Sequence, residues 1–90
     1  MKETLRTLLG KDVVVDTRSP WVYIGRLDAV QADSLLLHDV DVHDSGELSL
    51  PKERYVLSSC ETGIKANRRS VYVNLDYVVS VSPLADVIRF

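Results

Sequence analysis

Leucines recur at helical spacing near the start of the chain. Leu5, Leu8 and Leu9 occupy positions i, i+3 and i+4, so they share one side of a helix. Gly10 follows them, and glycine commonly ends a helix in a left-handed conformation. The pattern predicts a short helix over residues 2–9. Because two helical turns are marginal in isolation, this helix must pack against the rest of the fold.

Alternating and valine-rich segments then predict three β-strands. They are bounded by turn-forming residues and cover residues 12–17, 21–31 and 34–44. Gly25 lies inside the second strand, where a glycine usually marks a strong bend or a bulge.

The third strand alternates between apolar and polar side chains. Period-two alternation predicts one face with Leu36, His38, Val40 and Val42 and an opposite face with Asp39, Asp41 and His43. Carboxylate oxygens with one imidazole would suit a divalent cation. A solvated polar face accounts for the same alternation without a metal, and we favour that interpretation. We expect no metal site here, and a partly buried, hydrogen-bonded His38.

The segment that follows admits two interpretations. Ser49 stands where a helix cap would, and Pro51 is tolerated in the first helical turn. Gly63 fits a helix C-terminus. These two ends favour a helix over residues 51–62, whereas the alternative is a strand over residues 55–60. The helix would carry on one side Tyr55, Val56, Ser59 and Cys60.

Two further strands are predicted toward the end of the sequence. Residues 70–75 and 77–82 are rich in valine, and Pro83 ends the second strand. Valine is stiff at χ1 and fits a pleated sheet. The predicted order is therefore a helix, three strands, an insertion with a helix, and two strands. We expect one mainly β domain over residues 1–90.

Composition narrows the classes of protein that fit. The chain has 90 residues, of which 46% are hydrophobic and 27% charged, and this balance excludes intrinsic disorder. No apolar run approaches the roughly 18–20 residues of a membrane span, so no membrane association is expected. Cys60 is the single cysteine and forms no internal disulfide, which favours a cytoplasmic protein. Without a phosphate-binding glycine loop or paired catalytic carboxylates, we expect neither an enzyme nor a cofactor.

Two sets of residues resemble the motifs of the Sm-like (LSm) family. The family's first motif places Gly-Lys before strand one, then an apolar strand, then G-x-L in strand two. This chain matches it with Gly10-Lys11, Val13-Val14-Val15 and Gly25-Arg26-Leu27. The second motif is an apolar strand, a turn and a strand ending in I-S-P, matched by Val71-Tyr72-Val73 and by Val78 to Pro83.

This resemblance covers residues 2–42 and 70–83 and implies an architecture. The family folds as a strongly bent, five-stranded small barrel of the SH3-like kind, behind a short N-terminal helix. The insertion at residues 44–69 is longer than the family's usual connection between strands three and four, and the family offers no interpretation of it.

The resemblance also implies RNA binding, but at altered positions. Relatives bind uridine- or adenosine-rich single strands with an aspartate, a stacking side chain and an asparagine before strand three, and with an arginine of the second motif. The corresponding residues here are Gln31, Asp33, Leu35 and Asn74. Gln31 and Asn74 still offer amides to a base edge. Asp33 has no ring to stack on a base and would repel a phosphate.

Charge is distributed unevenly within a net charge of −2. Residues 27–47 carry six acidic side chains and no lysine or arginine, whereas residues 48–70 carry five basic and two acidic ones. Lys65, Arg68 and Arg69 form the one basic cluster, which is either a phosphate-contacting patch or a solvated loop. Neutralising three phosphates of a single strand gives a log–log salt slope of about −2, which means weak binding. If the protein binds an anion, we expect it to bind at the insertion.

The last two strands favour self-association. They are apolar and carry no lysine or internal proline to deter pairing, at Val71, Tyr72, Val73, Val78, Val79 and Val81. In the Sm-like fold, strand four of one subunit pairs with strand five of the next, so the resemblance implies a homo-oligomeric ring of about five to seven subunits. The alternative is a monomer whose insertion helix covers the edge.

The expected function follows from the fold and the ring together. We expect a ring-forming Sm-like protein that binds single-stranded RNA or serves as an RNA-associated scaffold. The alternative is a homo-oligomeric protein-interaction scaffold that does not bind nucleic acid.

Overall fold

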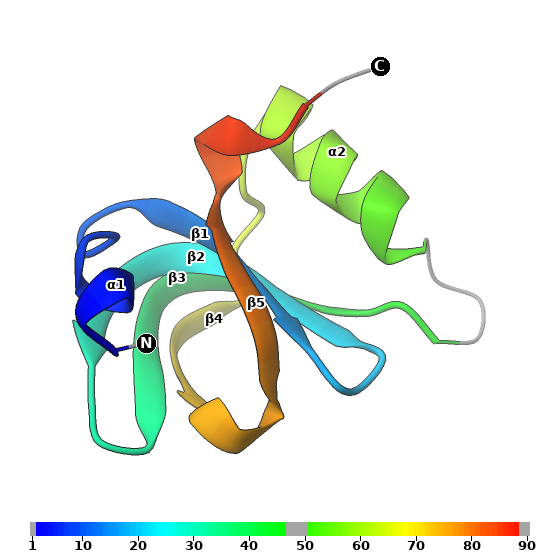
Figure 1. Ribbon diagram of the computed structural model, residues 1–90. Coiled ribbons are helices and arrows are strands. Elements are labelled where there is room, and N and C mark those ends of the chain that lie inside the picture. Colours follow the sequence, from blue (N-terminus) through cyan, green and yellow to red (C-terminus); the bar gives the residue numbers. More distant parts are fainter. Residues whose placement is uncertain (1, 47–50, 89–90) are drawn as a thin grey trace.

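A computed structural model describes residues 2–46 and 51–88. Its elements are α1 (Lys2–Arg6), β1 (Asp12–Thr17), β2 (Trp21–Val30), β3 (Ser34–Asp44), α2 (Lys52–Thr62), β4 (Arg68–Asn74), the 3-10 turn η1 (Leu75–Tyr77), β5 (Val78–Pro83) and the 3-10 turn η2 (Leu84–Asp86). The predicted order of elements is confirmed (Figure 1). The helical interpretation of the insertion is correct, and the alternative strand over residues 55–60 is wrong. The first helix is shorter than predicted and ends at Arg6.

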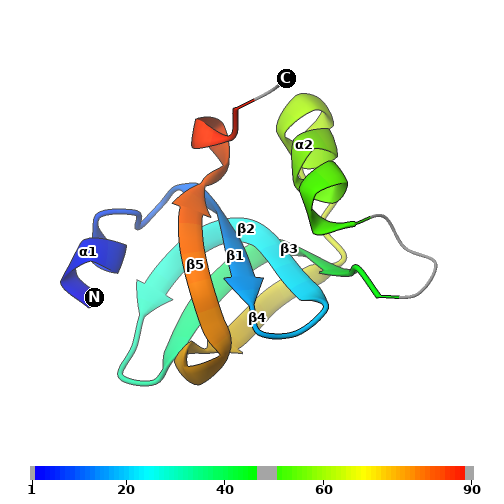
Figure 2. The ribbon, with the colours of Figure 1, turned by 45° about the vertical axis from the view of Figure 1, so that its right-hand side comes forward.

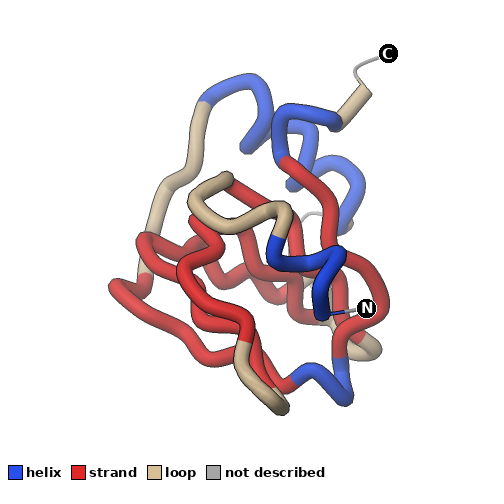
Figure 3. The backbone as a smooth tube through the Cα atoms, turned by 60° about the vertical axis from the view of Figure 1, so that its left-hand side comes forward, coloured by secondary structure: helices blue, strands red, loops and turns tan. Residues whose placement is uncertain are grey.

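The five strands form one strongly bent antiparallel sheet. Their order is β4-β3-β2-β1-β5, so β4 and β5 are the two edge strands. The bending turns the sheet into a small barrel with both helices outside it (Figures 2 and 3). The order of the sheet brings the first strand beside the last, although they lie at opposite ends of the sequence.

The bend is centred on Gly25, as the sequence predicted. The register of β2 against β3 shifts between Ile24 and Arg26, and two residues of β3, Asp39 and Val40, face this one glycine. A Cβ atom on Gly25 would lie 3.1 Å from the carbonyl oxygen of His38 and 3.2 Å from Cα of Val40. Glycine is therefore required here by close approach of two backbones rather than by its own dihedral angles.

The bulge in β3 corrects the predicted faces of that strand. Asp39 has a φ of 51°, and the alternation of buried residues changes phase on passing it. Leu35 and Leu37 are fully buried before the bulge, and Val40 is fully buried after it. A single apolar face through the whole strand is therefore wrong, because one extra residue is inserted. Leu36 and His38 are only partly buried, and His38 Nε2 lies 3.4 Å from Asp28 Oδ2.

β1 is buried on both of its faces. Val13 and Val15 point into the barrel core with Leu27, Leu35 and Leu37. Val14 points outward into a second apolar cluster, which α2 covers with Tyr55, Val56 and Cys60. The uninterrupted valine run of the sequence is thus explained by two cores rather than one, since a strand covered on both sides has no polar face.

α2 is attached to the sheet at its start and ends at a glycine. Lys52 Nζ donates to Asp16 Oδ1 at 2.5 Å and to the carbonyl of Thr17 at 3.1 Å. Gly63, with a φ of 91°, donates its N–H to the carbonyl of Ser59 at 2.9 Å, which confirms the predicted C-terminus. The predicted cap, Ser49, lies outside the described residues. Neither helix of the described chain has the length and hydropathy of a membrane span.

Replacing Gly25 by valine should destabilise the fold. The branched side chain would push against the backbone of β3, and overpacking of this kind typically costs about 1–3 kcal/mol. Urea unfolding of the wild type and of Gly25→Val measures the loss. Gly10→Ala is a useful comparison, because a Cβ there meets no atom within 4 Å and any loss arises from its φ of 81° alone. Equal stability of Gly25→Val and wild type would contradict the close approach.

Candidate nucleic-acid interface and assembly edges

The two amides singled out in the sequence lie at the same end of the barrel. Ser34 pairs with Asn74 across β3 and β4, and the N–H of Leu75 donates to the carbonyl of Asp33 at 2.9 Å. The β2–β3 turn, which contains Gln31, is therefore beside η1 (Figure 1). The structure therefore brings these two candidates together at one end of the barrel.

The side-chain oxygens of both amides accept hydrogen bonds from neighbouring residues. Ser34 donates its hydroxyl to Gln31 Oε1 at 2.8 Å, and the N–H of Asp76 donates to Asn74 Oδ1 at 2.9 Å. Asn74 thereby caps η1. Within the described chain their NH₂ groups have no hydrogen-bond partner, so they can still donate to an acceptor on a base. The exposed carboxylate of Asp33 lies in the same turn, and its negative charge would repel a phosphate there.

Arg18 brings a positive charge to this end of the barrel, which the sequence reasoning missed. Its N–H donates to the carbonyl of Tyr77 at 2.9 Å, its guanidinium donates to the carbonyl of Asp76, and its Cζ lies 5.8 Å from the centre of the Tyr77 ring. Arg18 lies in the β1–β2 turn. The resemblance implies an arginine in the second motif instead, at the position that Asn74 occupies here. No local spacing in the sequence signals a contact between residues so far apart.

The basic cluster lies at the opposite end of β4. Arg68 pairs with Val40 and Asn74 pairs with Ser34, so the two residues are separated by the length of the strand, about 20 Å at roughly 3.3 Å per residue. Lys65, Arg68 and Arg69 are all exposed. The structure therefore does not bring the basic cluster and the two amides into one site.

Asn67 fixes the position of this basic segment on β3. Its side-chain oxygen accepts from the N–H of Val42 at 3.0 Å, and its NH₂ donates to the carbonyl of Val42 at 3.0 Å. Its own N–H donates to the carbonyl of Val40 at 2.9 Å. The Asn67 side chain thus makes strand-like hydrogen bonds and fixes the backbone of this segment against β3. Near them Asp39 is paired with Arg26 at 3.1 Å, which leaves the patch positive.

The acidic residues of β3 lie in different surroundings. No group of three or more histidine, cysteine, aspartate or glutamate side chains with suitable geometry occurs in the part of the chain that the structure describes. Asp41 is buried and accepts from Asn67 Nδ2 at 3.3 Å, and His43 stacks on Tyr55 with 3.8 Å between ring centres. The predicted polar outer face is therefore only partly exposed, because α2 covers its second half.

Tyr55 is the titratable group most affected by this packing. Burial is the main cause that raises its pKa well above the ordinary value, and the neighbouring Asp41 carboxylate raises the pKa further. The phenol therefore stays neutral while α2 is docked, and ionisation of this group opposes docking.

Alkaline pH should weaken the fold through Tyr55. The unfolded tyrosine ionises near pH 10, but the folded one does so only at higher pH, so its contribution to stability is intact below pH 10 and is lost as pH rises further. Urea unfolding between about pH 9 and pH 11.5 should show a steeper loss for wild type than for Tyr55→Phe. Tyr77→Phe, at an exposed position, is the matched control. Parallel curves for wild type and Tyr55→Phe would contradict this assignment.

Both edge strands present apolar side chains to solvent. Tyr72 on β4 is 66% exposed and Val79 on β5 is 56% exposed. Val73, another predicted edge residue, is buried in the barrel core. Three further predicted edge residues are partly buried and pack against that core: Val71, Val78 and Val81. Apart from its pairing with β1, the backbone of β5 makes one bond at its start among the described residues, from the N–H of Val78 to the carbonyl of Leu75 in the adjoining turn η1. α2 packs on the outer side chains of β1 and β2, and no further strand pairs with β4 or β5 in the part of the chain that the structure describes.

Comparison with known proteins identifies the fold. No protein-family model and no curated protein sequence matches this chain. An Sm protein of Pyrococcus abyssii, solved in complex with a uridine heptamer, is similar with a TM-score of 0.62 and 20% identity over 90% of this chain and 93% of that one. A heptameric archaeal Sm protein is similar with a TM-score of 0.56 and 22% identity, covering 90% of this chain and 96% of its own.

A chain of the NatC complex bound to Gag peptide and CoA is also similar, with a TM-score of 0.56 and 19% identity over 86% of both chains. At these identities the comparisons establish the fold. The chain has the Sm-like fold: a short helix followed by a strongly bent five-stranded antiparallel sheet.

Proposed function

We propose that this protein is a subunit of a homo-oligomeric Sm-like ring, in which β4 of one copy pairs with β5 of the next. The observation that supports the proposal most strongly is that β4 and β5 are the two edge strands of the sheet. Two different edges that fit each other make a head-to-tail contact, and such a contact closes into a ring when the rotation between copies allows it. The heptameric archaeal Sm protein of the same fold supports this arrangement.

Burial of the exposed edge residues favours the same contact. Tyr72 and Val79 lie on the two edges that would meet, and removing apolar surface from water contributes about 25 cal/mol per Å². A long exposed edge is normally protected by lysine, proline or a covering element. β5 has none of these before Pro83, and a neighbouring strand would provide the cover.

Val79→Lys should dissociate the assembly into smaller species. The change places a charge among groups that must lose water when the edges pair, and Val79 is exposed enough for the subunit itself to stay folded. Light scattering coupled to gel filtration measures the mass, and circular dichroism checks the fold. Leu9→Lys, at an exposed leucine outside both strands, should keep the wild-type mass. An unchanged mass for Val79→Lys would reject the edge as the interface.

Contact with single-stranded RNA is a second candidate function, favoured by the basic segment between α2 and β4. Lys65 and Arg69 are exposed and have no ion-pair partner among the described residues, whereas the turn at Gln31 carries Asp33. A ring would repeat this segment once in every subunit and so raise the local density of cations. The Sm protein solved with a uridine heptamer supports RNA as the type of anion.

Exchanging these cations for acids should weaken RNA binding. We expect Lys65→Glu with Arg69→Glu to reduce the affinity for oligo-U or oligo-A by about tenfold or more at low salt, since each lost phosphate contact also flattens the salt dependence. Fluorescence polarisation with labelled oligonucleotides measures both. Gln31→Ala with Asn74→Ala tests the opposite end of β4 in the same assay. No binding by the assembled wild type would instead favour a protein-interaction scaffold.

A further inference from the structure

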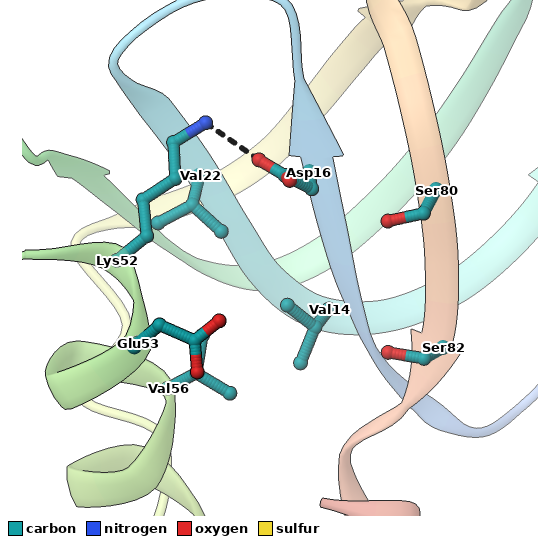
Figure 4. A pocket seen from close by; sticks show the side chains of 8 residues that line it. All are labelled: Val14, Asp16, Val22, Lys52, Glu53, Val56, Ser80 and Ser82. Atoms are coloured by element: carbon teal, nitrogen blue, oxygen red, sulfur yellow. Dashed lines mark hydrogen bonds and ion pairs between the residues drawn. The ribbon is translucent and has the colours of Figure 1, made fainter.

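A groove runs between α2 and β5 across the outer face of β1. It encloses about 180 Å³ and is lined by Val14, Asp16, Val22, Lys52, Glu53, Val56, Ser80 and Ser82. Figure 4 shows α2 on one side, β5 on the other, and Val14 between them. The floor is apolar, and both β5 side chains that line the wall are serines. The insertion helix thus creates a hollow directly beside an open edge.

We propose that this groove receives the side chain of Tyr72 from a second copy of this chain, while Glu53 pairs with Arg68 of that copy. The inference rests on the β4–β5 contact proposed above. It adds a role for the insertion, because α2 then recognises the neighbouring subunit and extends the contact beyond the strand edges.

The alternation of side chains places Tyr72 on the required face. On β5, Ser82 pairs with Val14 and Ser80 with Asp16, so these serines share the outer face of the sheet with the groove. On β4, Val71 and Val73 pack on the barrel core, so Tyr72 points outward. A strand added to the β5 edge continues the sheet, and its outward side chains stay on the outer face. Tyr72 of the second copy therefore comes beside the two serines.

Size supports the same placement. Cross-strand neighbours on one face lie about 4.5–5.5 Å apart, and diagonal ones at about 7–8 Å are still within reach of an aromatic ring. Because serine is small, the ring can lie over β5 and contact Val14. An enclosed cavity of about 150 Å³ holds benzene in an engineered protein, so a groove of 180 Å³ has room for one phenol ring. Tyr72 is 66% exposed in the single subunit and available for this contact.

Two oppositely charged residues, Arg68 and Glu53, support the same orientation of the two copies. Arg68 is exposed at the start of the same strand, and its guanidinium donates to the backbone carbonyl of Asn67. Antiparallel pairing brings the start of β4 to the end of β5, near Ser82. Glu53 lies on α2 at that level of the groove (Figure 4). Within the described chain neither Glu53 nor Arg68 has an ion-pair partner, whereas Lys52 is already held by Asp16.

A charge exchange between the two residues tests the proposal without RNA. Sedimentation velocity over a dilution series gives the subunit dissociation constant for Glu53→Arg, for Arg68→Glu and for the double variant. Each single change should raise the constant about tenfold or more, because it places two like charges together. The double variant should return to within about threefold of wild type. Tyr72→Ala should raise the constant about tenfold or more, as truncation of a buried aromatic anchor does.

Two controls separate the failure of this inference from failure of the ring. Leu9→Ala removes an exposed leucine outside the groove and should leave the dissociation constant unchanged. If Val79→Lys dissociates the assembly but Tyr72→Ala and both charge reversals do not weaken it, the edges pair and the groove proposal is overturned. If the wild type is monomeric throughout the series, the ring and the groove contact both fail.

Discussion

The close approach of β2 and β3 at Gly25 is the constraint on which the rest of the structure depends. One glycine faces two residues of a bulged strand, and the missing Cβ lets the backbones approach. The bend turns a flat five-stranded sheet into a barrel, so that Leu27, Leu35 and Leu37 share one core. β4 and β5 remain the two edge strands of the bent sheet. The bend therefore shapes both the interior of the subunit and the position of the two edges that the proposed ring would join.

α2 adds a second layer to this arrangement. It covers the outward residues Val14, Val22 and Ile24 and is fastened at its start by the ion pair of Lys52 with Asp16. In a domain of this size a single core buries a modest fraction of the chain, so a second apolar cluster is a substantial addition. Because α2 lies near β5 without covering its edge, it both stabilises the subunit and forms the wall of a groove.

Regular patterns made most of the fold predictable from the sequence, and the misses occurred where long-range contacts override them. Gly10 and Gly63 act locally through their positive φ, and the valine run and Gly25 give simple strand and bend signals, so these features could be anticipated. Strict alternation failed in β3 because the φ of 51° at Asp39 reverses the phase of the strand. For the candidate site, Gln31 and Asn74 were located by motif spacing. The cation of Arg18 and the His43–Tyr55 stack join residues that no spacing rule connects.

The pairing of β1 with β5 has a kinetic consequence. Val14 pairs with Ser82, 68 positions further along the chain (82 minus 14), so this ladder closes a loop that includes the other three strands. Contacts of such sequence separation slow the search for the native state, and small barrels rich in them typically fold in milliseconds to seconds. Until β5 arrives, β1 presents an unpaired valine-rich edge. A nascent or refolding chain is then most exposed to mispairing at residues 13–15, which are buried in the finished molecule.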